Sequence, residues 1–137
     1  MTDAAGYSGT PLGKKLGYRG AMRVFAGGIP DPIRHDIERS IDAKPTWLFV
    51  PEPELEAAHI FVKERAALED KLPALMPLLA PSGFIWVSWP KKASKVPTDI
   101  TEDTIRDVCL PIGLVDVKVC AVDATWSGLK LMKRKAK

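Results

Sequence analysis

Four short segments of this chain are built mainly from apolar residues, and they constrain its fold more than any other feature. They are residues 22–26 (MRVFA), 46–50 (TWLFV), 59–62 (HIFV) and 84–88 (FIWVS). Short apolar runs of this kind are typical of strands that are buried on both faces, and such strands belong to parallel sheets. Parallel strands need long connections, which are usually helices.

A helix is predicted after the first of these segments. Residues 30–32 (PDP) follow the glycine pair Gly27 and Gly28. Proline suits the first turn of a helix and Asp31 suits its cap. Isoleucines then recur every four residues from 33 to 41, which places them on one helical face. The order of elements here is therefore strand, glycine turn and helix.

Two more helices are predicted further along the chain. Leucines recur at helical spacing between residues 64 and 79, and Pro73 and Pro77 interrupt that pattern. Because each proline removes a hydrogen-bond donor and clashes with the preceding turn, we expect this helix to be kinked or split. We predict that Thr101 caps the last helix, since acidic residues follow it in the first turn.

The end of the chain has a different pattern. Apolar and polar residues alternate over 115–121, and a partner strand follows over 126–132, which predicts an antiparallel hairpin. The predicted fold class is α/β: a three-layer, Rossmann-like, mostly parallel sheet that ends in this hairpin. We expect an N-terminal arm over residues 1–20, a single α/β domain over 21–132 and a basic tail over 133–137.

Composition supports one folded domain and limits the classes of partner. The chain has 137 residues, of which 46% are hydrophobic and 27% charged. It contains no run of eighteen apolar residues and no basic, apolar start, so we expect a cytoplasmic protein without a membrane span. The net charge of +3 is concentrated in residues 130–137, and a nucleic-acid partner is therefore not expected.

The sequence predicts neither a metal site nor a catalytic group. Cys109 and Cys120 are too far apart for metal-ligand spacing, so we interpret them as reduced thiols. Ser88 has no histidine or aspartate at a sequence position that indicates a catalytic triad. His59 lies inside an apolar segment, and we interpret it as structural.

Ligands of open α/β sheets bind beyond the carboxyl ends of the strands, where loop amides and helix N-termini meet. The candidate ligand-binding residues at that edge are Gly27, Gly28, Glu52, Ser88, Trp89, Lys91, Lys92 and Trp126. Lys91 and Lys92 follow a Trp-Pro pair and could form a cationic lip for a phosphate or a carboxylate. The alternative is that they are ordinary solvated lysines. For Trp89 and Trp126, a place in a pocket wall and a place in the core are both open.

Four segments resemble a group of small bacterial proteins catalogued as a domain of unknown function, number 3052. The segments are GYSGTPLGKKLGYRGAMRV, FIWVSWPKK, PTDITEDTIRD and GLVDVKVCAVDATWSGLKLMKR. They cover most of the chain. This resemblance implies no particular reaction, because that family has no established activity.

A looser resemblance is to the methyltransferase fold that uses S-adenosylmethionine. The order HIFV, helix, LLAPSGFIWVSW, helix and hairpin is similar to the latter half of that fold. In that fold an acid and glycines follow the first strand, whereas MRVFAGGIPDP has only a glycine pair. An acid that closes the second strand usually holds the cofactor ribose, and Glu52 is the sole candidate here. Residues 22–56 are also short for a full first half, so the resemblance implies a shortened methyltransferase-like sheet.

These observations favour a non-catalytic binding or regulatory protein on a degenerate methyltransferase-like fold. The alternative function is a small S-adenosylmethionine-dependent methyltransferase, with Gly27, Gly28 and Glu52 around the cofactor. The sequence indicates S-adenosylmethionine as a cofactor only under the methyltransferase alternative, and the cofactor is otherwise unknown. The expected partners are a small anionic ligand, and a partner protein or a second copy of the chain.

Overall fold

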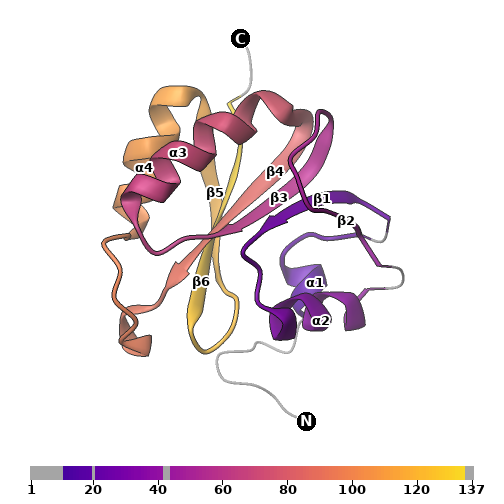
Figure 1. Ribbon diagram of the computed structural model, residues 1–137, viewed down its shortest axis with the longest axis horizontal. Coiled ribbons are helices and arrows are strands. Elements are labelled where there is room, and N and C mark those ends of the chain that lie inside the picture. The colour runs from indigo at the N-terminus through magenta and orange to yellow at the C-terminus, as the bar shows by residue number, and fades with distance from the viewer. Residues whose placement is uncertain (1–10, 20, 42–43, 135–137) are drawn as a thin grey trace.

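The computed structural model describes residues 11–19, 21–41 and 44–134, which form one layered α/β arrangement (Figure 1). The six strands are β1 (Arg23–Gly27), β2 (Thr46–Leu48), β3 (Leu55–Phe61), β4 (Leu79–Pro90), β5 (Leu114–Ala121) and β6 (Trp126–Lys133). They form one sheet in the order β2-β1-β3-β4-β6-β5. Neighbours among β2, β1, β3 and β4 are parallel, and β6 is antiparallel to both β4 and β5. The predicted parallel sheet with a terminal hairpin is confirmed.

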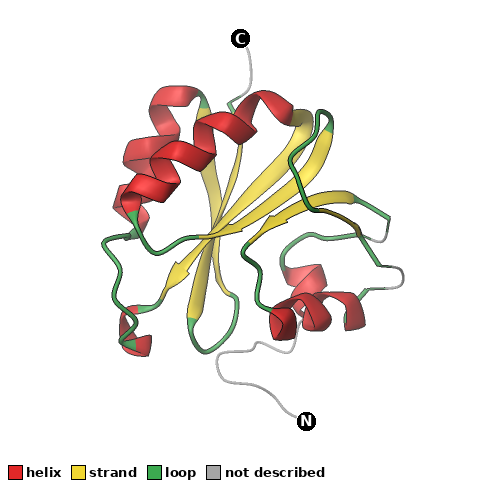
Figure 2. Cartoon of the chain, viewed as in Figure 1, coloured by secondary structure: helices red, strands yellow, loops and turns green. Residues whose placement is uncertain are grey.

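Helices cover both faces of this sheet (Figure 2). The α-helices are α1 (Leu12–Lys15), α2 (Asp31–Arg39), α3 (Arg65–Leu75) and α4 (Glu102–Cys109), and short 3₁₀ turns are η1 (Met76–Leu78), η2 (Lys92–Ser94) and η3 (Leu110–Ile112). Side chains of α3 and α4 pack in one buried cluster, which we call the first face. Side chains of α1 and α2 pack in another, which we call the second face. None of the described helices is both long and apolar enough to cross a membrane.

The helix signals in the sequence are local, and most of them act as predicted. Thr101 caps α4: its hydroxyl accepts the Thr104 backbone N–H at 3.2 Å, and the Thr104 hydroxyl accepts the Thr101 N–H at 3.2 Å. The split of the proline-containing helix is also present, because α3 continues through Pro73 but ends at Leu75, and η1 follows it.

The predicted cap of α2 is wrong. The residue before the helix is Pro30, whose extended backbone (φ −65°, ψ 142°) leads into the first turn. Asp31 is the first helical residue, and its side chain makes no capping hydrogen bond. Its carboxylate lies 3.4 Å from the Arg34 guanidinium one turn later, so this acid pairs along the helix instead of capping it.

β2, β3 and β4 differ in length from the predicted segments. β3 begins at Leu55, four residues before the predicted start at His59. β2 ends at Leu48, because its pairing with β1 ends there, and the next two residues turn into solvent: Phe49 is 96% exposed and Val50 is 61% exposed. β4 begins earlier than predicted. Residues 81–83 lie within β4 as an irregularity, since Leu55 pairs with Leu79 whereas Ala57 pairs with Phe84.

The described part of the predicted arm packs into the core of the domain. Leu12, Leu16 and Tyr18 are buried in the cluster on the second face. The indole Nε1 of Trp86, at the centre of β4, donates a hydrogen bond to the Leu16 carbonyl oxygen at 2.6 Å. Residues 12–18 therefore complete the second face of the sheet.

We predict that Leu16→Ala lowers the free energy of unfolding by about 2–5 kcal/mol, the usual range for truncating a buried leucine. Leu110→Ala is the matched control, because Leu110 is 38% exposed and should cost much less. Urea denaturation followed by circular dichroism measures both. Equal costs for the two variants would mean that residue 16 is not part of the core.

Candidate functional site

The carboxyl edge of the parallel strands is where this fold would bind a ligand. The chain moves from β1 to its neighbour β2 on one side, and β3 then lies on the other side of β1. This reversal between β1 and β3 is a topological switch point, and crevices for ligands form beyond the strand ends at such points. Gly27 is the last residue of β1 there, Gly28 follows it, and Phe61 ends β3.

Aromatic side chains lie at the switch point. The Phe61 ring stacks on the His59 ring, with centroids 4.4 Å apart, and the Trp126 ring meets Phe61 edge-on at 5.0 Å. On the first face, a Cβ at Gly27 would come within 3.2 Å of the Phe25 ring. Gly28 has φ +77°, a conformation that favours glycine. Gly28 and Trp126 both lie beside Phe61, so the end of β1 and the start of β6 meet at this aromatic cluster.

Glu52 does not share this edge. Its carboxylate forms an ion pair with the Arg23 guanidinium at 2.7 Å, and Arg23 is the first residue of β1. Glu52 therefore lies toward the amino end of the strands, away from Gly27 and Gly28. The expectation of one common rim fails for this residue, because the connection that follows β2 turns straight back toward the start of β3.

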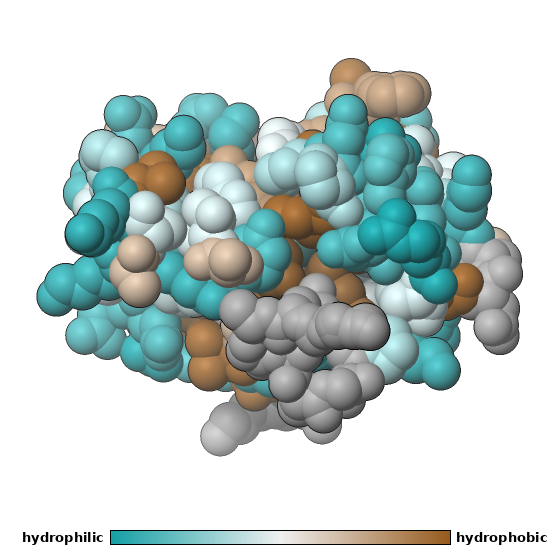
Figure 3. Space-filling model, turned by 90° about the horizontal axis from the view of Figure 1, so that it is seen from below, coloured by the Kyte–Doolittle hydropathy of each residue, from teal (hydrophilic) through white to brown (hydrophobic). Residues whose placement is uncertain are grey.

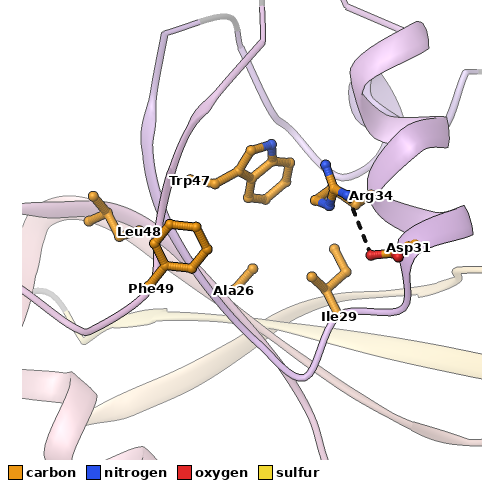
Figure 4. A pocket seen from close by; sticks show the side chains of 7 residues that line it. All are labelled: Ala26, Ile29, Asp31, Arg34, Trp47, Leu48 and Phe49. Atoms are coloured by element: carbon orange, nitrogen blue, oxygen red, sulfur yellow. Dashed lines mark hydrogen bonds and ion pairs between the residues drawn. The ribbon is translucent and has the colours of Figure 1, made fainter.

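A pocket opens beside the ends of β1 and β2, and we call it the edge pocket. It has a volume of about 400 Å³ and is lined by Ala26, Ile29, Asp31, Arg34, Trp47, Leu48 and Phe49. Figure 4 shows the Trp47 and Phe49 rings facing Ile29 and the start of α2 across this space. Seen from below, the molecule shows hydrophobic atoms among the hydrophilic atoms at the middle of the face (Figure 3).

The two charged residues that line the edge pocket, Asp31 and Arg34, form an ion pair with each other. The Arg34 guanidinium lies 3.4 Å from the Asp31 carboxylate and 3.5 Å from the Glu38 carboxylate. Glu38 also accepts a hydrogen bond from the Trp47 indole Nε1 at 2.7 Å. The remaining walls are aliphatic and aromatic. The pocket is therefore suited to an apolar or aromatic group that makes one or two polar contacts at its α2 side.

The predicted lysine corner is divided between the core and a separate pocket. Trp89 is buried and packs in the cluster on the first face. The Lys91 backbone N–H donates to the Thr125 carbonyl at 2.7 Å, which joins this corner to the hairpin turn. Lys92 lines a pocket of about 430 Å³ together with Trp89, Pro90 and residues 95–98 and 100–102, and we call it the corner pocket. Neither Lys91 nor Lys92 lines the edge pocket.

Ser88 belongs to a buried chain of polar groups that crosses the second face. Tyr18 Oη lies 2.9 Å from His59 Nδ1, and His59 Nε2 lies 2.7 Å from Ser88 Oγ. All three residues are buried, and His59 and Ser88 have no exposed surface. This chain joins residues 12–18 to β3 and β4. A catalytic triad has a carboxylate at the position that Tyr18 occupies in this chain of polar groups. The hydroxyl of Ser88 is also buried away from solvent.

The sequence contained only a partial signal for this chain. His59 and Ser88 are the polar residues of two otherwise apolar segments, but their meeting depends on the register that pairs Phe61 with Ser88. The part played by Tyr18 depends on how residues 12–18 fold over the sheet. Burial lowers the pKa of His59 to about 3 and raises the pKa of Tyr18, so both groups are neutral near pH 7.

Comparison with known proteins places the fold but not the reaction. No model of a known protein family matches the chain, and no curated protein matches its sequence. The resemblance to the bacterial family of unknown function therefore stays a prediction. Among the described residues, no three His, Cys, Asp or Glu side chains are grouped so that they could hold a metal ion.

Several of the similar solved structures are methyltransferases. A ribosomal protein methylase from Lactobacillus delbrueckii subsp. bulgaricus has a TM-score of 0.56 at 10% identity, over 90% of this chain and 76% of its own. A methyltransferase from Aquifex aeolicus that depends on S-adenosylmethionine has a TM-score of 0.55 at 11% identity, and the match covers 88% of this chain and 86% of that one. Magnesium protoporphyrin IX methyltransferase from Synechocystis, solved with S-adenosylmethionine bound, has a TM-score of 0.57 at 11% identity. The match covers 90% of this chain and 74% of that one. The chain thus has a Rossmann-like fold of the methyltransferase type.

We predict that His59 makes the fold less stable as the pH falls. The unfolded histidine binds a proton near pH 6.5, whereas the folded one does so only near pH 3. Between these values the unfolded state holds more protons, so the free energy of unfolding should fall by about 1 kcal/mol per pH unit. Urea denaturation at pH 7, 6 and 5 measures this slope.

The two histidines of the chain provide a matched comparison for this prediction. His59→Gln should remove most of the slope between pH 7 and 5, whereas His35→Gln should keep it, because His35 is exposed on α2. An unchanged slope in His59→Gln would show that another group causes the pH dependence.

Proposed function

We propose that this chain is a non-catalytic binding protein whose ligand site is the edge pocket. The ligand presents an apolar, preferably aromatic, group to the walls formed by Ile29, Trp47 and Phe49. A polar atom of the ligand contacts the ion pair of Asp31 and Arg34. The observation that carries this proposal is a pocket of about 400 Å³ at the carboxyl ends of β1 and β2, with mainly apolar walls.

The exposure of Phe49 supports the same proposal. A phenylalanine that is 96% exposed gains almost nothing from the folded chain itself. Val50, beside it, is 61% exposed. Large apolar side chains at the rim of a pocket contribute once a ligand or partner covers them. The rim and the pocket together therefore form one continuous surface for binding.

The geometry offers less support for a methyltransferase. The resemblance to that fold implies an acid at the end of the second strand to hold the cofactor ribose, and Glu52 pairs with Arg23 at the other end of β1. The residues that follow β2 at the carboxyl edge are Phe49 and Val50. The Ser88 hydroxyl and the His59 imidazole, which could serve acid-base chemistry, are both buried against each other.

We predict that indole, used as an aromatic probe, binds in the edge pocket. Titration followed by amide chemical shifts should give saturable changes at Ile29, Trp47 and Phe49. Phe49→Ser should weaken binding by roughly three- to tenfold, the range expected for one aromatic contact. Because Phe49 is exposed, this variant should fold normally.

Leu110→Ser is the control, since it removes an apolar side chain that is 38% exposed and lies outside the pocket. Its indole affinity should equal that of the unmodified protein. Shifts that do not saturate, or that weaken equally in both variants, would contradict a site in the edge pocket.

A further inference from the structure

A second recess lies at the amino ends of β1, β3 and β4, the end of the sheet opposite to the edge pocket. Its volume is about 240 Å³. We call it the amino-end recess, and its walls include Gly17, Arg19, Glu56, Ser82, Phe84 and Lys130. They come from the segment before β1, the start of β3, the irregular part of β4 and the middle of β6.

Lys130 is held in this recess by its neighbours. Its ammonium lies over the Phe84 ring, 4.5 Å from the ring centroid. Gly17 has φ +83°, and a Cβ at that position would lie 3.3 Å from Lys130 Nζ. A larger residue at 17 would therefore both strain the backbone and crowd the ammonium group. The fold thus keeps space for a cation at a fixed place.

Positive charge in and beside the recess is not balanced by contacts. In the described part of the chain, no carboxylate lies within ion-pair distance of Arg19, Lys118 or Lys130. Burial, together with repulsion from Lys118 and Arg19, lowers the pKa of Lys130. The one acid in the wall, Glu56, accepts the Arg23 backbone N–H at 3.2 Å.

A partly buried cation without a counterion is unfavourable, and a bound anion would remove that cost. Arg19, Lys130 and Glu56 line the recess, so its walls carry two positive charges and one negative charge. Guanidinium and ammonium groups are the side chains that bind phosphate oxygens best. We propose that the amino-end recess is a binding site for a dianionic phosphate group, supplied either as free phosphate or by a phosphorylated small molecule.

Inorganic phosphate and glycerol 3-phosphate are the two probes, each titrated at constant ionic strength and followed by amide chemical shifts. We expect saturable shifts at Gly17, Phe84 and Lys130. Lys130→Met and Arg19→Gln should each weaken binding about tenfold or more, the effect of losing one charged hydrogen bond. Tighter binding of the ester would identify a phosphorylated small molecule, and tighter binding of inorganic phosphate would identify the free ion.

Lys71→Met is the matched control, because it removes an exposed lysine from α3 on the first face. Its affinity for both probes should equal that of the unmodified protein. Arg19 is exposed, so Arg19→Gln keeps the test valid if Lys130→Met does not fold. Shifts that rise without saturation, or an equal loss in Lys71→Met, would overturn the site. Neither result depends on the edge pocket, which lies at the other end of the strands.

Discussion

The connection between β2 and β3 is the constraint on which the rest of the structure depends. β2 ends at Leu48 and β3 begins at Leu55, so residues 49–54 must return from the carboxyl edge to the amino edge. Six extended residues span about 20 Å, roughly the length of one strand, which leaves none for a helix or a further strand. β2 therefore stays at the edge of the sheet, and Glu52 is carried to the amino end beside Arg23. Phe49 and Val50 remain at the carboxyl edge, where they are 96% and 61% exposed.

This constraint gives the two ends of the sheet different chemistry. The carboxyl edge carries aromatic and aliphatic side chains around the edge pocket, and its charged groups are paired with one another. The amino end carries cations around a smaller recess. Between the two ends, the chain of Tyr18, His59 and Ser88 joins the segment before β1 to the centre of the sheet. Buried polar networks of this kind fix a single arrangement when every member has a partner. Both proposed sites are thus built on a rigid centre.

Much of the fold could be predicted, because its signals are local. Apolar runs indicated the parallel strands, alternation indicated the hairpin, and Thr101 indicated the start of α4. The site was predicted less well, because its residues meet through contacts that are distant in sequence. The hydrogen bond between His59 and Ser88 depends on the register of β3 against β4. The burial of Leu16 depends on Trp86, seventy residues away. The position of Glu52 depends on the path of a connection, which an acid between two prolines does not reveal.

Equilibrium dialysis with labelled S-adenosylmethionine, up to millimolar concentration, tests the central claim most directly. That claim is that the short return from β2 to β3 leaves the carboxyl edge without the acid that a methyltransferase would use for the cofactor ribose. The account predicts no saturable binding to the purified protein. Saturable binding at micromolar concentrations that is lost in Glu52→Gln would contradict it, because it would mean that Glu52 reaches the cofactor and that the edge forms a working methyltransferase site.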